Sequence, residues 1–178
     1  MRRIPIALII TTAIAFAASA SAAELETRSM IEGANMVNAP LLAHERGIDV
    51  AETVHDRPSE YQTLVRVTVT TGEQTRSLAG TLFAGARPRI VEIKGIPIEA
   101  DFARHMLYVT NQDKPGFIGR FGATLAEAGI NIATFHVGRE APGGNAVALI
   151  EIDGELPADV LAKVRALPQV QQARPLKF

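Results

Sequence analysis

The C-terminal residues 106–178, MLYVTNQDKPGFIGRFGATLAEAGINIATFHVGREAPGGNAVALIEIDGELPADVLAKVRALPQVQQARPLKF, decide the fold. Their apolar and β-branched residues predict strands over 106–110, 130–138, 147–153 and 170–176. Apolar residues at helical spacing predict one helix that Gly129 ends and a second helix that Pro157 begins. The order β-α-β-β-α-β predicts a ferredoxin-like fold for this part of the chain.

The preceding residues predict a second, smaller antiparallel sheet. Between 64 and 70, polar residues alternate with valines, which is the pattern of a strand with one buried face. Residues 75–83 predict the returning strand, and the isoleucine-rich stretch 90–98 predicts further β structure with a turn at Lys94-Gly95. A short helix over 38–47 comes before them. The predicted fold class is α+β, with a domain boundary near residues 101–105.

Composition excludes several classes of protein. The chain has 178 residues, and 47% of them are hydrophobic, which is enough for a packed core. The 18 basic and 19 acidic residues give a formal charge of -1, so no nucleic-acid partner is predicted. Cysteine is absent, which excludes disulfides, thiolate metal sites and a cysteine nucleophile.

Motifs for catalysis, metals or nucleotides are not found either. The 4 histidines have no metal-ligand spacing, and no serine stands in a G-x-S-x-G motif. No G-x-G-x-x-G motif joins a predicted strand to a predicted helix. The sequence therefore predicts no catalytic residues, no metal site and no cofactor site in this chain.

Residues 1–23 have the pattern of a secretory signal peptide. Arg2 and Arg3 precede an apolar stretch over 4–18, and small residues around Ala20 resemble a cleavage site. This stretch is shorter than the roughly 20 residues of a transmembrane helix, so no stable membrane span is expected. Two explanations stay open, a working signal peptide that exports the protein to the periplasm and a start within a damaged longer gene.

Two segments carry a family resemblance. Residues 108–140, with Asp113-Lys114-Pro115-Gly116 before a helix and Gly129-Ile130-Asn131-Ile132 after it, resemble an ACT domain. Upstream, NMVNAPLLAHERGI (35–48) and GTLFAGARPRIVEIKGI (80–96) resemble the intervening domain of long-form D-3-phosphoglycerate dehydrogenases. The resemblance implies a partial intervening domain over 30–101 and an ACT domain over 104–178.

The same resemblance implies a regulatory function. The substrate- and nucleotide-binding domains of the family have no counterpart in this sequence, so we expect a chain that is inactive alone and holds no NAD, the cofactor of the parent family. The expected activity is binding of L-serine or another small amino acid, in the cytoplasm, as part of the regulation of serine biosynthesis. An exported small-molecule-binding or assembly protein that reuses an ACT domain is the alternative.

Three residues are the candidates for the amino-acid site. Asp113 precedes a helix, where a carboxylate either caps the helix or accepts the ammonium group of a ligand. Asn131 is either a turn residue or, by resemblance, an amide that reaches the ligand across the subunit interface. Asn111 stands where members of the family often have His or Tyr, and so departs from the family's pattern.

Two further expectations concern an anion site and assembly. Arg87, Arg89 and Lys94 lie within eight residues and are either the solvated edge of a strand or the anion site that the resemblance implies for the intervening domain. The edges of a four-stranded sheet need covering, and the apolar faces of 106–110 and 130–137 therefore predict a homo-oligomer that assembles through the ACT domain.

Overall fold

A computed structural model describes residues 37–45, 47, 49, 51, 61, 63–72, 74–84 and 87–178. The signal-like segment 1–23 lies outside the described residues. The helices and strands are α2 (Ala39–Glu45), β1 (Leu64–Thr71), β2 (Gln74–Phe83), β3 (Arg87–Ile93), β4 (Ile96–Asp101), β5 (His105–Gln112), α3 (Phe117–Glu127), β6 (Ile132–Arg139), β7 (Asn145–Ile152), α4 (Ala158–Arg165) and β8 (Val170–Lys177). The strands form two antiparallel sheets, which confirms the α+β class.

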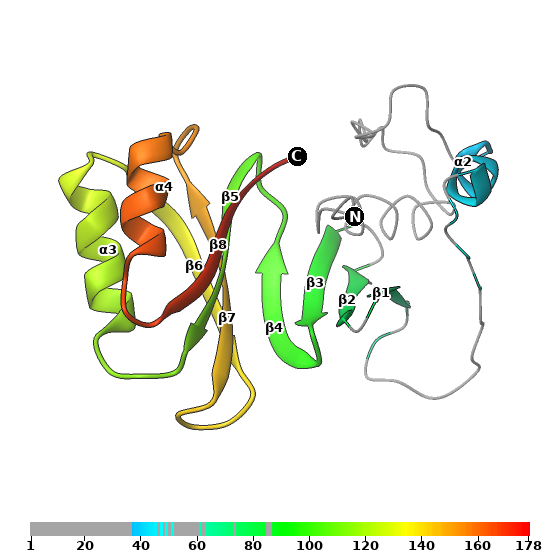
Figure 1. The fold of residues 1–178 in the computed structure, drawn as a ribbon, viewed down its shortest axis with the longest axis horizontal. Coiled ribbons are helices and arrows are strands. Elements are labelled where there is room, and N and C mark those ends of the chain that lie inside the picture. The colour runs from blue at the N-terminus through cyan, green and yellow to red at the C-terminus, as the bar shows by residue number, and fades with distance from the viewer. Residues whose placement is uncertain are drawn as a thin grey trace.

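Strands β5 to β8 make the C-terminal sheet, in the spatial order β6-β7-β5-β8. Helices α3 and α4 cover one of its faces (Figure 1). Phe121, Leu125 and Val164 of these helices are completely buried with Leu107 and Ile150 of the sheet, because each element turns one apolar face inward. This arrangement confirms the predicted ferredoxin-like order.

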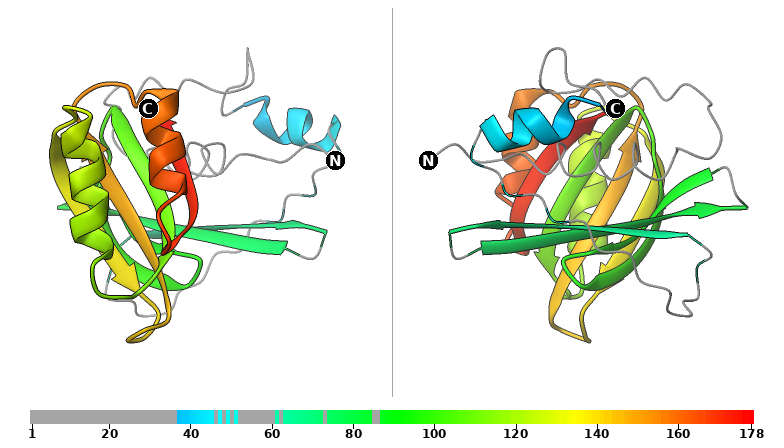
Figure 2. Two further views of the ribbon diagram at one scale, coloured as in Figure 1. Left: turned by 60° about the vertical axis from the view of Figure 1, so that its left-hand side comes forward. Right: turned by 90° about the vertical axis from the view of Figure 1, so that its right-hand side faces the viewer.

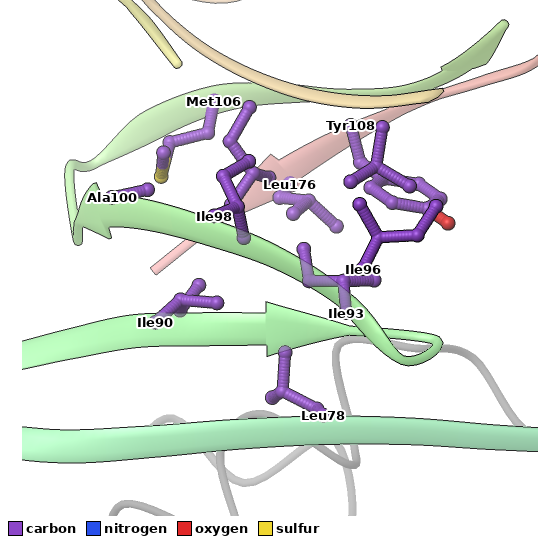
Figure 3. Close-up of a cluster of buried hydrophobic side chains, with 11 residues drawn as sticks. Leu78, Ile90, Ile93, Ile96, Ile98, Ala100, Met106, Tyr108 and Leu176 are labelled. Carbon is purple, nitrogen blue, oxygen red and sulfur yellow. The ribbon is translucent and has the colours of Figure 1, made fainter. Parts of the chain in front are cut away.

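Strands β1 to β4 make the N-terminal sheet, a meander in the spatial order β1-β2-β3-β4. It packs on the face of the C-terminal sheet that the helices leave free, so the molecule has three layers. Figure 2 shows β1 and β2 crossing the strands of the C-terminal sheet and extending beyond it. Figure 3 shows the shared core, in which side chains from β2, β3 and β4 point toward Met106, Tyr108 and Leu176.

Strand β5 is consequently an inner strand with both faces covered, and residues from Met106 to Asn111 are all buried. The prediction that residues 106–110 offer an apolar face to a second subunit is wrong for this reason. Strand β6, in contrast, is an edge of the C-terminal sheet, and β7 is the one described strand that pairs with it.

The two sheets approach each other most closely at Gly138 on β6. A Cβ atom at this position would collide with the backbone oxygen of Pro97 on β4 and lie 3.1 Å from the Ile96 side chain. Only glycine allows the backbones of the two strands to come this close. The contact covers the inner face of β6 and leaves its outer edge without a described partner strand.

Within the described ranges, no helix is both long and apolar enough to cross a lipid bilayer.

Candidate functional site

The loop that joins β5 to α3 holds Asp113 at the surface. Its carboxylate oxygen Oδ2 accepts hydrogen bonds from Arg139 Nη1 at 3.0 Å and from the Gly143 backbone N–H at 3.1 Å. The backbone N–H of Asp113 donates to the oxygen of Gly144 at 2.9 Å. These bonds attach the loop to the turn between β6 and β7.

Asp113 does not cap helix α3. The residue before the helix is Gly116, with φ at +88°, and no side chain accepts a hydrogen bond from the first turn. The capping interpretation is therefore wrong, because the chain turns through Pro115 and Gly116 before the helix begins. The carboxylate is free of a role in the helix and remains 30% exposed.

Hydrogen bonding keeps Asp113 ionised. The Gly143 N–H first, and then the Arg139 guanidinium, lower the pKa of the Asp113 carboxyl below its ordinary value. Both described hydrogen bonds go to Oδ2. Oδ1 is therefore the atom on which an incoming cation, such as an ammonium group, can be accepted without breaking either bond.

Asn111 lies two residues before Asp113, and only 2% of it is exposed. Its Nδ2 donates to the backbone oxygen of Gln112 at 2.9 Å, whereas its Oδ1 is buried without a hydrogen-bond partner among the described residues. The buried Oε1 of Gln169 has no described partner either, and Gln169 directly precedes Val170, which pairs with Asn111. Each of these two buried acceptors thus lacks a donor among the described residues.

Asn131 lies at the opposite end of β6 from Arg139 and Asp113. Its exposed Nδ2 donates to Asp153 Oδ2 at 2.9 Å, and its backbone oxygen accepts from the Asp153 N–H. The eight residue-to-residue steps from Asn131 to Arg139 correspond to about 27 Å of extended chain. Within one chain, Asn131 and Asp113 are therefore not brought together.

Two β6 edges paired around a two-fold axis would change this geometry. In an antiparallel pair, the start of one strand lies beside the end of the other. The Asn131 end of one copy then lies next to the Asp113 end of the second copy. An amide and a carboxylate placed in this way can bind a zwitterion from both sides.

The three cations of the intervening region do not form one cluster. Arg87 is exposed at the start of β3, and Lys94 follows the other end of the same strand. Arg89 is already engaged: its Nε lies 3.1 Å from Asp101 Oδ1, and its guanidinium carbon lies 5.0 Å from the centre of the Phe83 ring. Whether Arg89 contributes to an anion site remains a prediction.

Three neighbours of the candidate residues were not predicted from the sequence: Arg139, Gly143 and Gln169. Residues 139–144 lie between the strands predicted over 130–138 and 147–153, and no site residue was predicted among them. No local signal was available, because Arg139 and Gly143 are 26 and 30 residues from Asp113 in sequence. In the part of the chain that the structure describes, no group of acidic or histidine side chains could hold a metal ion.

Comparison with known families connects the two sheets to a known pair of domains. The D-3-phosphoglycerate dehydrogenase intervening domain matches residues 11–94, and the ACT domain matches residues 105–169. This chain belongs with the intervening and ACT domains of D-3-phosphoglycerate dehydrogenases. Helix α2 and the N-terminal sheet belong to the intervening domain, with β4 in the interval between the two matches, and the C-terminal sheet with its helices is the ACT domain.

Individual relatives agree with this assignment. The D-3-phosphoglycerate dehydrogenase of Methanocaldococcus jannaschii is 32% identical over 142 residues, which is 80% of this chain and 27% of the relative. The enzyme of Bacillus subtilis is 35% identical over 136 residues, 76% of this chain and 26% of the relative. The enzyme of Synechocystis is 30% identical over 154 residues, 86% and 28% respectively. The chain thus spans about a quarter of the length of the curated relatives that it matches.

The ACT domain also gives the coarse function of the C-terminal sheet. ACT domains in general bind small amino acids and form oligomers. The loop around Asp113, the β6 edge and Asn131 all belong to this domain.

Proposed function

We propose that this chain is the amino-acid-binding regulatory part of a D-3-phosphoglycerate dehydrogenase and that it binds L-serine between two ACT domains. The observation that carries the proposal is the position of the two residues at the edge strand β6: Asn131 directly precedes this strand, and Asp113 is bonded to Arg139 at its other end. A two-fold pairing of these edges forms two identical sites, each with a carboxylate from one subunit and an amide from the other.

Each group has a chemical role in this site. The ammonium of serine donates to Asp113 Oδ1, while Arg139 and Gly143 hold Oδ2 and fix the carboxylate. Asn131 leaves Asp153 and offers both a donor and an acceptor to the ligand. Asn111 supplies a buried acceptor at the base of the loop.

Binding of serine at such an interface regulates the protein through thermodynamic linkage between ligand binding and subunit arrangement. Serine stabilises the paired arrangement of subunits because each bound molecule contacts both of them. Any catalytic domain attached to the pair is biased toward the state compatible with it. In the parent family the regulated reaction is NAD-dependent oxidation of 3-phosphoglycerate.

Complementation between variants tests the shared site. Asp113→Asn and Asn131→Ala should each weaken L-serine binding tenfold or more in titration calorimetry, because each removes one side of every site. Co-expression of the two variants should restore about a quarter of the wild-type sites: half of the dimers are mixed, and each mixed dimer has one intact site.

The matched control combines Asp113→Asn with Asn111→Ala. Asn111 and Asp113 come from the same subunit, so no mixed dimer contains an intact site and no binding should return. Restored binding in this control, or none in the first mixture, contradicts a site shared between subunits. Absence of heat with wild type at millimolar L-serine, with binding of glycine or L-alanine instead, changes the ligand but keeps the site.

We also propose that the protein acts in the cytoplasm, where the parent pathway operates. Support comes from the intervening-domain match, which begins at residue 11 and so overlaps the signal-like segment 1–23. The alternative is an exported small-molecule-binding or assembly protein, which the signal-like segment itself favours. The mass of the protein in cell fractions separates the two: a periplasmic product that begins near Ala23 supports export, and an uncleaved cytoplasmic product supports regulation.

A further inference from the structure

Three cationic residues gather at one end of the interface between the N-terminal and C-terminal sheets, which we call the seam. Arg76 on β2 pairs with Val69, whose side chain packs against the shared core, so Arg76 lies on the inner face of the N-terminal sheet. Arg174 on β8 pairs directly with Tyr108 on the inner face of the C-terminal sheet. Lys94 lies in the β3–β4 turn, and its backbone N–H donates to the oxygen of Ser77, next to Arg76.

The Tyr108 side chain extends into the same end of the seam. The residue is 1% exposed, and its hydroxyl is buried without a hydrogen-bond partner among the described residues. Figure 3 shows its oxygen directed toward the end of the sheets where the β3–β4 turn lies. A buried hydroxyl with no partner is rare in folded proteins, because its desolvation is uncompensated.

Among the described residues, no ion pair compensates these positive charges either. Ion pairs between described residues join Arg66 to Glu92, Arg89 to Asp101, Arg139 to Asp113 and Lys177 to Glu155, and none includes the seam cations. The described side-chain hydrogen bond of Arg76 goes to the neutral Gln74, at 2.8 Å. Partial burial and then the charge of Arg76 lower the pKa of Lys94, so the two cations are close enough to repel each other.

Lys94 has a backbone conformation that lysine rarely adopts, which indicates that its side chain is needed at this position. Lys94 and Gly95 have φ of +54° and +79°, the pattern of a type I′ hairpin turn, in which asparagine, aspartate or glycine usually takes the first position. A lysine in this left-handed conformation is uncommon.

We infer that Arg76, Lys94, Arg174 and the Tyr108 hydroxyl form a binding site for a small multivalent oxyanion, of the phosphate or phosphate-monoester class. The guanidinium groups of Arg76 and Arg174 suit bidentate contacts with such an anion, and Lys94 adds a point charge. The buried Tyr108 hydroxyl donates one hydrogen bond to it from the protein interior. The site takes residues from both sheets, so its ligand fastens the intervening domain to the ACT domain. It is separate from the amino-acid site and from Arg87 and Arg89.

Titration of the full chain with inorganic phosphate at constant ionic strength tests this site. Wild type should bind phosphate at millimolar concentration or below, and Arg174→Gln should weaken binding at least tenfold, equivalent to about 1.4 kcal/mol. Tyr108→Phe keeps the buried ring and removes only the hydroxyl, so it should fold normally and bind more weakly. Lys94→Gln is a second, surface-accessible variant in case Arg174→Gln fails to fold.

Lys163→Gln is the matched control, because it removes one positive charge from the exposed side of α4 and should leave the affinity unchanged. Arg87→Gln tests the separate anion site predicted at the far end of β3. Equal affinities of wild type, Lys94→Gln and Tyr108→Phe, or no binding by wild type, overturn the inference. Loss of binding in Arg87→Gln alone places the anion site at the other end of β3 and overturns it too. Methyl phosphate in place of inorganic phosphate distinguishes a monoester ligand from the free ion. None of these results depends on serine binding.

Discussion

The two sheets differ in how deeply their strands are buried. In β7 of the C-terminal sheet, every residue from Ala146 to Ile150 is buried, because helices cover one face and the N-terminal sheet covers the other. In β1 of the N-terminal sheet, exposed residues alternate with half-buried valines. An antiparallel sheet with two covered faces thus has the continuous apolar strands that are otherwise typical of parallel sheets. We therefore expect the stability of the molecule to be concentrated in the C-terminal sheet and its seam.

The largest effect should come from truncating the centre of the seam. Leu149 on β7 is 0% exposed, so Leu149→Ala should lower the free energy of unfolding by about 3 kcal/mol through lost burial and a cavity. Val67→Ala on β1 is the matched change at a half-buried position and should cost about 1 kcal/mol. Denaturant titration measures both. Equal losses would contradict the contrast between the two sheets.

A somewhat smaller effect should follow from crowding the contact between β4 and β6. In Gly138→Ala, the new methyl group meets the Pro97 backbone oxygen, and the strands must separate at a cost of about 2 kcal/mol. Gly122→Ala is the control, because a Cβ atom there meets nothing within 4 Å and the position is helical. It should stabilise the protein by about 0.5 to 1 kcal/mol. If Gly138→Ala is also neutral or stabilising, the two sheets are not closely packed at this point.

Local periodicity was sufficient to predict the elements but not their assembly. The alternation in β1, the helical spacing in α3 and the left-handed Gly129 after it are short-range features, and the structure confirms each of them. The packing of the N-terminal sheet on the C-terminal one depends on contacts such as Gly138 with Pro97, 41 residues apart (138 − 97 = 41). For the same reason, helix capping was one of the two roles predicted for Asp113, whereas its hydrogen-bond partners lie at the end of β6 and in the turn after it.

Tyr108 allows the burial of the seam to be measured by pH. Burial raises the pKa of its hydroxyl to about 12, above the ordinary value near 10. Between these values the unfolded chain releases the proton and the folded protein keeps it, so stability falls as pH rises. Relative to Tyr108→Phe, wild type should lose about 1.4 kcal/mol between pH 8 and pH 11. Denaturant titration of both proteins in phosphate-free buffer checks this. Parallel pH profiles would indicate that water reaches the seam.

The smallest effect should occur at the exposed end of the C-terminal sheet, at Asp113. The Gly143 N–H and the Arg139 guanidinium lower its pKa in the folded protein, so the unfolded chain takes up the proton first as pH falls. The resulting stabilisation is complete above the ordinary pKa of about 3.9 and is lost as pH falls below it. Asp113→Asn should therefore be less stable than wild type at pH 7 and approach it at pH 3. The difference should be small, because the pair is exposed to solvent and screened.

Arg139→Gln keeps the hydrogen bond from Gly143, the larger cause of the lowered pKa of Asp113, and so should retain most of the pH dependence of stability. An Asp113→Asn profile that stays parallel to that of wild type down to pH 3 would show that the carboxylate is not held by these two donors, and the fixed Oδ2 of the proposed serine site would be lost with them.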